Sequence, residues 1–414
     1  MEPPTLVGGL FALYPTPMPL TPKQFAMISM KEASLDDSMK RDPLTDYFEG
    51  YFHVTLNTRD ESPTLGYIEG NPDAADGSTD APRCRMTQVG KGVEKCWKNI
   101  PSFYPNVTII ESQVMPEHFH GLLHLKFKKG VNLGRVINGF MIGCSHEYWD
   151  VIGIDWRSNR GTTKEEWRAI ARKFQDKHHT RSFRGPALFV RGYNDVEAVS
   201  EEEVEIKRQY IRNNPRKRLI TRGKPDRFSI SRNHHSANWT LSRALNAVAA
   251  DKWIGHEPAK CQKLQANIQA RLKEGMGIDI IGNKQLLSAA CKVSLICHRA
   301  DSNLFEQQKA AVLKAAREGT VVVSAFISPK ERDIMKQLMV EQLPFIEIMD
   351  NGFSERYKPT GKAFYSTAEN RHVQLTCWKY IYQREKQISR EMCLVMNELA
   401  RLISGVPDDW WKSF

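Results

Sequence analysis

Strands and helices alternate along the C-terminal part of the chain, and this alternation restricts the fold more than any other feature of the sequence. Runs of β-branched and apolar residues predict strands at 291–298, 320–327, 343–349 and 373–380. Amphipathic segments predict helices at 303–319, 328–342 and 387–404. Ser328 and Glu331 form a capping box at the start of the second helix. Because strands that alternate with helices pair in parallel, the C-terminal half is predicted to be an α/β domain.

The N-terminal half has a less regular order of elements. Strand-like runs occupy residues 51–58 and 187–193, and two more lie within 106–125. Predicted helices occupy 90–99, 163–178 and 200–214, and predicted loops occupy 71–82 and 215–235. Ser200 and Glu203 cap the third helix, and Pro215 is interpreted as its stop signal. Strands and helices that do not alternate strictly predict an α+β domain.

Shifts in composition divide the chain into four predicted segments. They are an irregular N-terminal extension over 1–44, a first domain over 45–230, a helical linker over 231–275 and a second domain over 276–414. A length of 414 residues fits two or three domains of ordinary size.

Composition narrows the class of protein. No stretch approaches the roughly 20 apolar residues that a membrane helix needs, and the start of the chain lacks the basic region of a signal peptide. The eight cysteines are scattered and form no CxxC pair, which favours a reduced, cytoplasmic protein. The formal net charge of +11 suggests nucleic acid as a partner, and no membrane contact is expected.

The segment Met115-Pro116-Glu117-His118-Phe119-His120 holds the sharpest local motif. Side chains at i and i+2 of a strand share a face, so His118 and His120 point the same way, about 7 Å apart along the chain. Two imidazoles in this arrangement can bind one divalent cation. The ordinary alternative is one surface histidine and one histidine that is hydrogen-bonded in the core.

A second motif lies at the end of the capped helix. Tyr210 and Asn214 are four residues apart and are therefore neighbours on one helical face. A phenol is a poor nucleophile unless a metal or cations polarise the group that it attacks. An amide oxygen suits a hard cation as a ligand. The ordinary alternative is a surface tyrosine followed by a capping asparagine.

Taken together, the strand FHVTLNT, the segment MPEHFHGLLH, the segment FVRGYND and the helix end YIRNNP, in that order, resemble the single-tyrosine His-hydrophobe-His transposases. The resemblance is to the branch associated with repetitive extragenic palindromes (REP) and covers residues 45–230. It implies a ferredoxin-like antiparallel sheet with helices on one face. It also implies single-stranded hairpin DNA as the partner, a cytoplasmic location near the bacterial nucleoid, and either a monomer or a homodimer.

The same resemblance implies a role for each matching residue. Tyr210 would be the nucleophile that forms a 5′-phosphotyrosine, and His118, His120 and Asn214 would bind Mg²⁺ or Mn²⁺. The chain departs from the compact members in two ways: Phe119 is bulky, and the long spacing from His120 to Tyr210 predicts an insertion among residues 141–180.

Basic residues are concentrated after the tyrosine. The segment Lys207–Arg232 contains ten basic residues and one acidic residue. Such a segment binds phosphates in a salt-dependent way, largely without sequence preference, or is simply a solvated face. The predicted DNA-binding residues are Lys207, Arg208, Arg212, Arg216, Lys217, Arg218, Arg222, Lys224 and Arg227.

The C-terminal half also resembles a family. Residues 280–385, with VVVSAFISPKERDIM and GFSERYKPTGKAF, resemble the Rossmann-like domain of the DNA-processing protein A and lysine-decarboxylase-like group. The glycine-rich loop of dinucleotide binders is missing from this half, so no cofactor is expected there. Ser324 and residues 328–330 lie where an anion could bind, although Ser328 is more simply a helix cap.

The sequence therefore predicts a metal-dependent single-strand DNA endonuclease and strand transferase, joined to a Rossmann-like accessory domain. The alternative is a non-catalytic DNA-binding protein that keeps the transposase fold, with its C-terminal domain as a nucleotide- or DNA-binding module.

Overall fold

The fold is described from a computed structural model of the full chain. It describes residues 45–59, 61–127, 130–156, 165, 187–236, 239–249, 258–381 and 388–413. The predicted irregular extension over 1–44 lies outside these residues, as does the predicted helix over 163–178 apart from residue 165. The described residues form two compact units, which divide between Ile220 and Thr221. We call them the N-terminal and C-terminal units.

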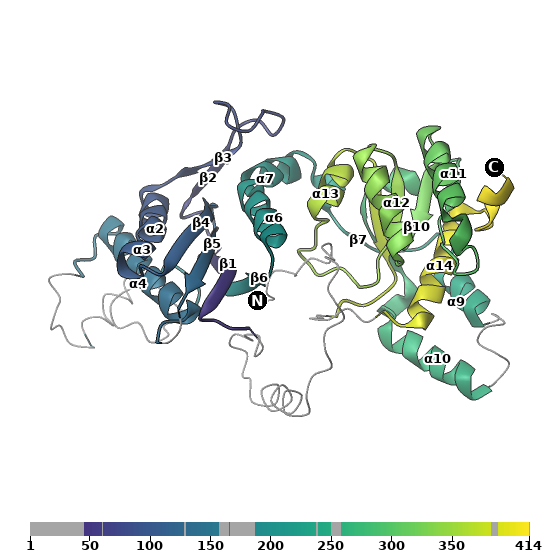
Figure 1. The fold of residues 1–414 in the computed structure, drawn as a ribbon, viewed down its shortest axis with the longest axis horizontal. Coiled ribbons are helices and arrows are strands. Elements are labelled where there is room, and N and C mark those ends of the chain that lie inside the picture. The colour runs from purple at the N-terminus through teal and green to yellow at the C-terminus, as the bar shows by residue number, and fades with distance from the viewer. Residues whose placement is uncertain are drawn as a thin grey trace. The chain divides into compact units, whose positions relative to one another are not determined.

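The N-terminal unit is built on a four-stranded antiparallel sheet (Figure 1). Its strands, in spatial order, are β4 (Val107–Val114), β5 (His118–Lys126), β1 (Glu49–Asn57) and β6 (Asn194–Ala198). A separate hairpin pairs β2 (Gly66–Glu69) with β3 (Arg83–Met86), and the predicted loop over 71–82 connects them. The predicted strand at 187–193 is wrong: Phe189 makes a single bridge to Thr58, and the strand begins at Asn194.

Helices cover both faces of this sheet. Helices α2 (Gln88–Lys98), α3 (Ile100–Phe103) and α4 (Leu133–Val151) lie with the face that carries Phe119, Leu123 and Leu125, and form the main core there. Helix α6 (Glu201–Arg212) packs Val204 and Ile211 against Leu122 on the other face. The antiparallel sheet agrees with the sequence prediction, but the expected placement of helices on one face alone is wrong. The ferredoxin-like assignment stays a prediction.

The predicted loop over 215–235 is also wrong. Helix α7 (Asn214–Gly223) follows α6 directly, and α8 (Pro225–Phe228) and β7 (Ser231–His234) follow it. Pro215 is the second residue of α7, where a missing N–H costs nothing because the first turn of a helix has no intrahelical acceptors. The proline therefore starts a helix instead of ending one.

The C-terminal unit is built on a six-stranded sheet with the order β7, β8 (Ile278–Gly282), β12 (His372–Thr376), β11 (Phe345–Ile348), β10 (Val321–Ser324) and β9 (Lys292–Ser294). Strands β9 to β12 pair in parallel, as the sequence predicts, and β8 and β7 add an antiparallel edge. The parallel strands follow chain order across the sheet. The reversal of strand order that opens a ligand crevice in doubly wound sheets is therefore absent from these strands, and the Rossmann-like assignment stays a prediction.

Helices again lie on both faces of this sheet. Helices α11 (Phe305–Arg317) and α12 (Pro329–Val340) share one apolar cluster with the sheet. Helices α9 (Leu241–Ala249), α10 (Pro258–Arg271) and α14 (Arg390–Ser404) share another, so the predicted helical linker contributes to the core of this unit. The remaining helical elements are α13 (Gly361–Ala368) and the 3₁₀ turns Glu274–Met276, Lys284–Ser288, Ser302–Leu304 and Trp410–Ser413.

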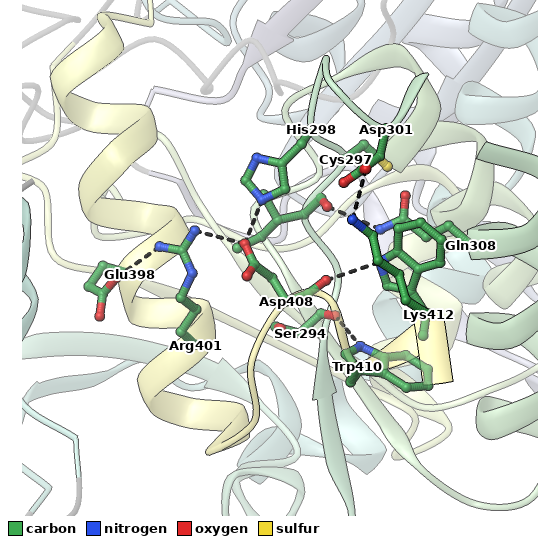
Figure 2. Close-up of polar contacts among 12 residues, drawn as sticks. Ser294, Cys297, His298, Asp301, Gln308, Glu398, Arg401, Asp408, Trp410 and Lys412 are labelled. Carbon is green, nitrogen blue, oxygen red and sulfur yellow. Dashed lines mark hydrogen bonds and ion pairs between the residues drawn. The ribbon is translucent and has the colours of Figure 1, made fainter. Parts of the chain in front are cut away.

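The last described residues, 405–413, close over the edge strand β9, and we call them the C-terminal clasp (Figure 2). Trp410 donates its indole N–H to the carbonyl of Ser294 at 2.9 Å, which covers part of the edge that β10 does not pair. The Trp411 ring beside it is 2% exposed.

A charge cluster fastens this clasp. Asp408 accepts from His298 at 2.6 Å and from Arg401 at 2.8 Å, and Lys412 pairs with Asp301 at 2.8 Å. The hydrogen bond to Asp408 raises the pKa of His298, against desolvation and the charge of Arg401. A raised histidine pKa adds stability that is complete below its ordinary value near 6.5 and is lost as the pH rises through the raised value.

We therefore expect the clasp to loosen as the pH rises above about 6.5. Because His298 is about half exposed, solvent screening limits the effect to about two- to fivefold in hydrogen-exchange protection of residues 405–413. Exchange rates corrected for the intrinsic pH dependence measure it. His298→Gln should remove the pH dependence, and an equal dependence in that variant contradicts the assignment to His298.

None of the helices within the described ranges is long and apolar enough to cross a membrane.

Candidate active site in the N-terminal unit

Strands β1 and β5 place four polar side chains on the sheet face that α6 covers. Residue alternation on β5 turns Phe119 into the main core and leaves His118 and His120 on the opposite face. On β1 the same alternation buries Phe52, Val54 and Leu56 in that core and leaves His53 and Thr55 beside the β5 histidines. Thr55 lies directly opposite His120 in the register of the two strands.

His120 is held from two sides. Its ring is 5% exposed, and its Nδ1 lies 3.1 Å from Nε2 of His53 and 3.0 Å from Oγ1 of Thr55. Burial lowers the pKa of His120 well below its ordinary value. Burial and then the charge of Lys207 lower the pKa of His53 to about 3. Both rings are therefore neutral near pH 7, which is the form that can bind a metal.

His118 lies at the more open end of the pair. Its ring packs edge-on against His120 with ring centroids 4.8 Å apart, and 18% of its side chain is exposed. Its Nδ1 lies 3.4 Å from the carboxylate of Glu117, which also pairs with Arg218 at 2.8 Å. Burial opposes ionisation of Glu117, but the hydrogen bond to His118 and the nearby charges outweigh it and lower the pKa of Glu117.

Helix α6 brings Tyr210 to the histidines. The ring centroid of Tyr210 lies 5.6 Å from that of His120 and 5.7 Å from that of His53, with both pairs edge-on. The Lys217 ammonium lies 5.1 Å from the centre of the tyrosine ring. Tyr210 is 36% exposed, so a ligand can reach it, yet the surrounding atoms exclude enough water to raise its pKa. The phenol is therefore protonated at neutral pH.

Asn214 begins α7, one turn after Tyr210. Its Nδ2 donates to the carbonyl of Tyr210 at 3.1 Å. Asn213, between the two helices, keeps αR geometry, so the two residues keep their helical spacing across the helix boundary. With the amide nitrogen bonded to the backbone, the amide oxygen is the atom with which Asn214 can bind a cation.

The donor set fits a divalent cation. By ligand chemistry, the imidazoles of His118 and His120 with an amide oxygen would suit Mg²⁺ or Mn²⁺, of which Mn²⁺ accepts nitrogen ligands more readily. Because the partners of His120 contact Nδ1, its Nε2 is the nitrogen left for a metal. Within the described residues no group of three or more His, Cys, Asp and Glu side chains is arranged to hold a metal ion.

The predicted DNA-binding residues of the N-terminal unit divide into two groups. Arg208, Arg212, Arg216 and Arg218 pair with acidic residues of the same unit: Glu205, Glu111, Asp76 and Glu117. Arg216 also donates to the carbonyls of Pro72 and Ala74, which ties the loop between β2 and β3 to α7. These arginines are paired within the unit, so their full charge is not directed to a ligand.

Lys207 and Lys217 form the second group. Lys217 lies over the ring of Tyr210, and the charge of Lys207 acts on His53. Burial lowers the pKa of each ammonium. Two partly desolvated cations therefore lie within the group of side chains that contains the predicted nucleophile.

The remaining predicted basic residues belong to the C-terminal unit. Arg222 is exposed, Lys224 donates to the carbonyl of Ala368 at 2.9 Å, and Arg227 donates to Asn283 at 3.2 Å.

The helix start at Ser328 is filled by the chain itself. The carboxylate of Glu331 accepts from the backbone N–H groups of Cys297, Ile327 and Ser328. The capping interpretation of Ser328 is therefore confirmed, and this helix end gives no support to the predicted anion site.

Sequence reasoning missed His53 and Thr55. The alternation in Phe52-His53-Val54-Thr55 was visible and predicts two polar side chains on one face of a strand. What the sequence could not supply was the pairing of β1 with β5, which places these side chains at Nδ1 of His120.

Comparison with known proteins gives short or distant matches. No protein-family model matches the chain. A segment of 77 residues is 29% identical to an uncharacterised protein of Haemophilus influenzae, and the match covers 19% of this chain. It spans 37% of that relative, so the chain covers little more than a third of the curated relative that it matches.

Two solved structures resemble part of the fold. One, from Deinococcus radiodurans, is described as a candidate transposase; it is 15% identical, with 42% of this chain and 97% of that chain aligned at a TM-score of 0.23. The other is a REP-associated tyrosine transposase bound to a REP hairpin; it is 13% identical, with 43% of this chain and 74% of that chain aligned at a TM-score of 0.23. Similarity at this level carries no argument about the chemistry of this chain.

Proposed function

We propose that the N-terminal unit is a transposase-like, metal-dependent endonuclease and strand transferase that acts on single-stranded hairpin DNA. The observation that carries this proposal is the contact of the Tyr210 ring with His120 and His53, beside His118. A partly exposed phenol against neutral, strand-held imidazoles is the arrangement expected of a tyrosine nucleophile beside a metal site. The motif order described above supplies the expectation of DNA as the substrate.

The reaction is a transesterification at one phosphodiester. The Tyr210 oxygen forms a bond to phosphorus, and the bond to the 3′ oxygen of the preceding nucleotide breaks. The phenolic proton is lost and the 3′ oxygen gains a proton, so the products are a 5′-phosphotyrosine and a free 3′-hydroxyl. Because one phosphodiester replaces another, strand transfer by the reverse step needs no ATP.

His118, His120 and the amide oxygen of Asn214 would hold Mg²⁺ or Mn²⁺. A cation bound there would neutralise charge on the scissile phosphate. Thr55 and His53 keep the His120 ring in place, and Glu117 contacts His118. Because burial lowers the pKa of His120, no proton competes with a cation for this ring at neutral pH.

Lys207 and Lys217 would add positive charge beside the phenol. Partly desolvated ammonium groups attract a phosphate more strongly than fully hydrated ones, because less water must be displaced. A DNA strand that enters over α6 and α7 would therefore meet the positive charges of these two lysines next to Tyr210.

Mapping a covalent adduct tests the proposal. The full chain is incubated with labelled single-stranded hairpins in MnCl₂, denatured in detergent, digested with nuclease and analysed by mass spectrometry. We expect a nucleotide on the peptide that contains Tyr210, and no adduct when EDTA is present. An adduct on another residue contradicts the assignment of the nucleophile.

The same experiment separates the alternative function. If no hairpin gives an adduct, and His118→Ala leaves salt-dependent DNA binding unchanged, the unit is a non-catalytic DNA-binding protein.

Size-exclusion chromatography with light scattering would decide between a monomer and a homodimer.

A further inference from the structure

Two side chains of β1 converge on one nitrogen of His120. Thr55 Oγ1 lies 3.0 Å and His53 Nε2 lies 3.1 Å from His120 Nδ1. All three residues project from the sheet itself, and β1 pairs with β5 on one side and β6 on the other. Their relative positions are therefore fixed by the ladder of an interior strand and not by a loop.

A neutral imidazole carries one proton, so the position of that proton on His120 decides which nitrogen can bind a cation. If Nδ1 carries it, the N–H donates to Thr55 or His53, and Nε2 keeps its lone pair. If His53 instead donates from Nε2, His120 Nδ1 is the acceptor, and the proton of His120 sits on Nε2, where it blocks binding. The two arrangements are exclusive.

We propose that His53 and Thr55 are positioning residues that hold His120 in the Nδ1–H tautomer, so that Nε2 presents its lone pair to a divalent cation. In this tautomer one N–H is shared between two acceptors within 3.1 Å, a three-centre bond that is common in proteins. In the other tautomer His53 and Thr55 would both have to donate to the single lone pair of Nδ1, which favours the Nδ1–H form. Both histidines are almost completely buried, so water cannot easily replace either partner.

His53 also contacts the proposed nucleophile. Its ring lies edge-on to Tyr210, with centroids 5.7 Å apart, while Tyr210 also lies edge-on to His120. One ring therefore contacts both the metal-binding histidine and the proposed nucleophile. This inference rests on the proposed function, since it assigns His120 to a cation site.

The tautomer can be measured without metal or DNA. Nitrogen-15 shifts of the histidine rings distinguish a protonated Nδ1 from a protonated Nε2, and loss of signals in His120→Gln assigns them. We expect His120 to be protonated at Nδ1 in the wild type. Protonation at Nε2 would overturn the inference, whatever the fate of the proposed reaction.

Cation affinity gives the second readout, by calorimetry with MnCl₂ alone. Thr55→Val removes one acceptor with little change of shape, and His53→Leu removes the other; we expect the double variant to bind Mn²⁺ about 10- to 100-fold more weakly. His53→Gln keeps an acceptor oxygen and should retain most of the affinity, while Tyr51→Phe is a control on the same face. Far-ultraviolet circular dichroism identifies any variant that fails to fold.

The outcomes separate the two proposals. A wild type that binds Mn²⁺ with the same affinity as the double variant overturns the positioning role alone. A wild type that binds no Mn²⁺ contradicts the proposed metal site, and the tautomer measurement then decides whether His53 and Thr55 orient His120.

Discussion

Replacing Tyr210 by phenylalanine should abolish the covalent DNA adduct, with a loss of at least about 10³-fold in the rate of its formation. The substitution removes only the hydroxyl oxygen that would attack phosphorus. The remaining ring keeps the edge-on contacts with His53 and His120, so the site should stay intact. Hairpin binding should therefore stay within about threefold of the wild type, measured by fluorescence anisotropy.

Tyr51→Phe is the matched control for this prediction. Tyr51 lies on the same sheet face, where its hydroxyl donates to Glu201 and its ring stacks on His124, outside the Tyr210 cluster. Its adduct rate should match the wild type. An adduct that persists in Tyr210→Phe would show that another group is the nucleophile.

The second large effect is on stability: Gly121→Ala should destabilise the N-terminal unit by about 3 kcal/mol. Gly121 lies next to His120 on β5, and the Trp97 ring of α2 packs directly on its Cα hydrogens. An added methyl group would overlap three ring carbons of Trp97. The indole has no room to retreat, because it is fully buried against Phe119 and Phe140.

Hydrogen exchange of β5 under native conditions measures this loss, since it reports on the N-terminal unit separately from the other. The control is a double-mutant cycle with Trp97→Phe, which removes the carbons that the alanine would strike. Gly121→Ala should lower the free energy of unfolding clearly less in the Trp97→Phe background. An equal loss of stability in both backgrounds would contradict the proposed clash.

The elements that the sequence predicted well carry their signals locally. Helix α12 has its capping box, and the strands β10 to β12 are β-branched and bounded by turns, so short windows suffice. Among the strands that it missed, β6 and β7 have the polar sequences NDVEA and SRNH. Each is a strand because it lies at a sheet edge beside a well-formed partner, β1 or β8, and this pairing is tertiary information.

The site residues also differ in how far the sequence could predict their positions. His118 and His120 share a face by strand geometry, and Tyr210 and Asn214 share a face by helix geometry, so each pair could be predicted. The convergence of His53 and Thr55 on His120 depends on the register between β1 and β5, which no local pattern states. For the basic segment, the sequence made the charge evident. It did not show that three of the arginines pair with Glu111, Glu117 and Asp76.

The C-terminal clasp has a consequence for biosynthesis. Trp411 is fully packed, and Trp410 donates a hydrogen bond to Ser294 of β9. More than a hundred residues separate Trp410 from this strand in the chain. During translation the parallel sheet can form before these tryptophans leave the ribosome, but its edge then stays open to other nascent chains. The N-terminal unit has no such dependence, because its strands are complete once Ala198 has emerged. Messages truncated before Trp410 should therefore yield chains in which the first unit folds and the second aggregates.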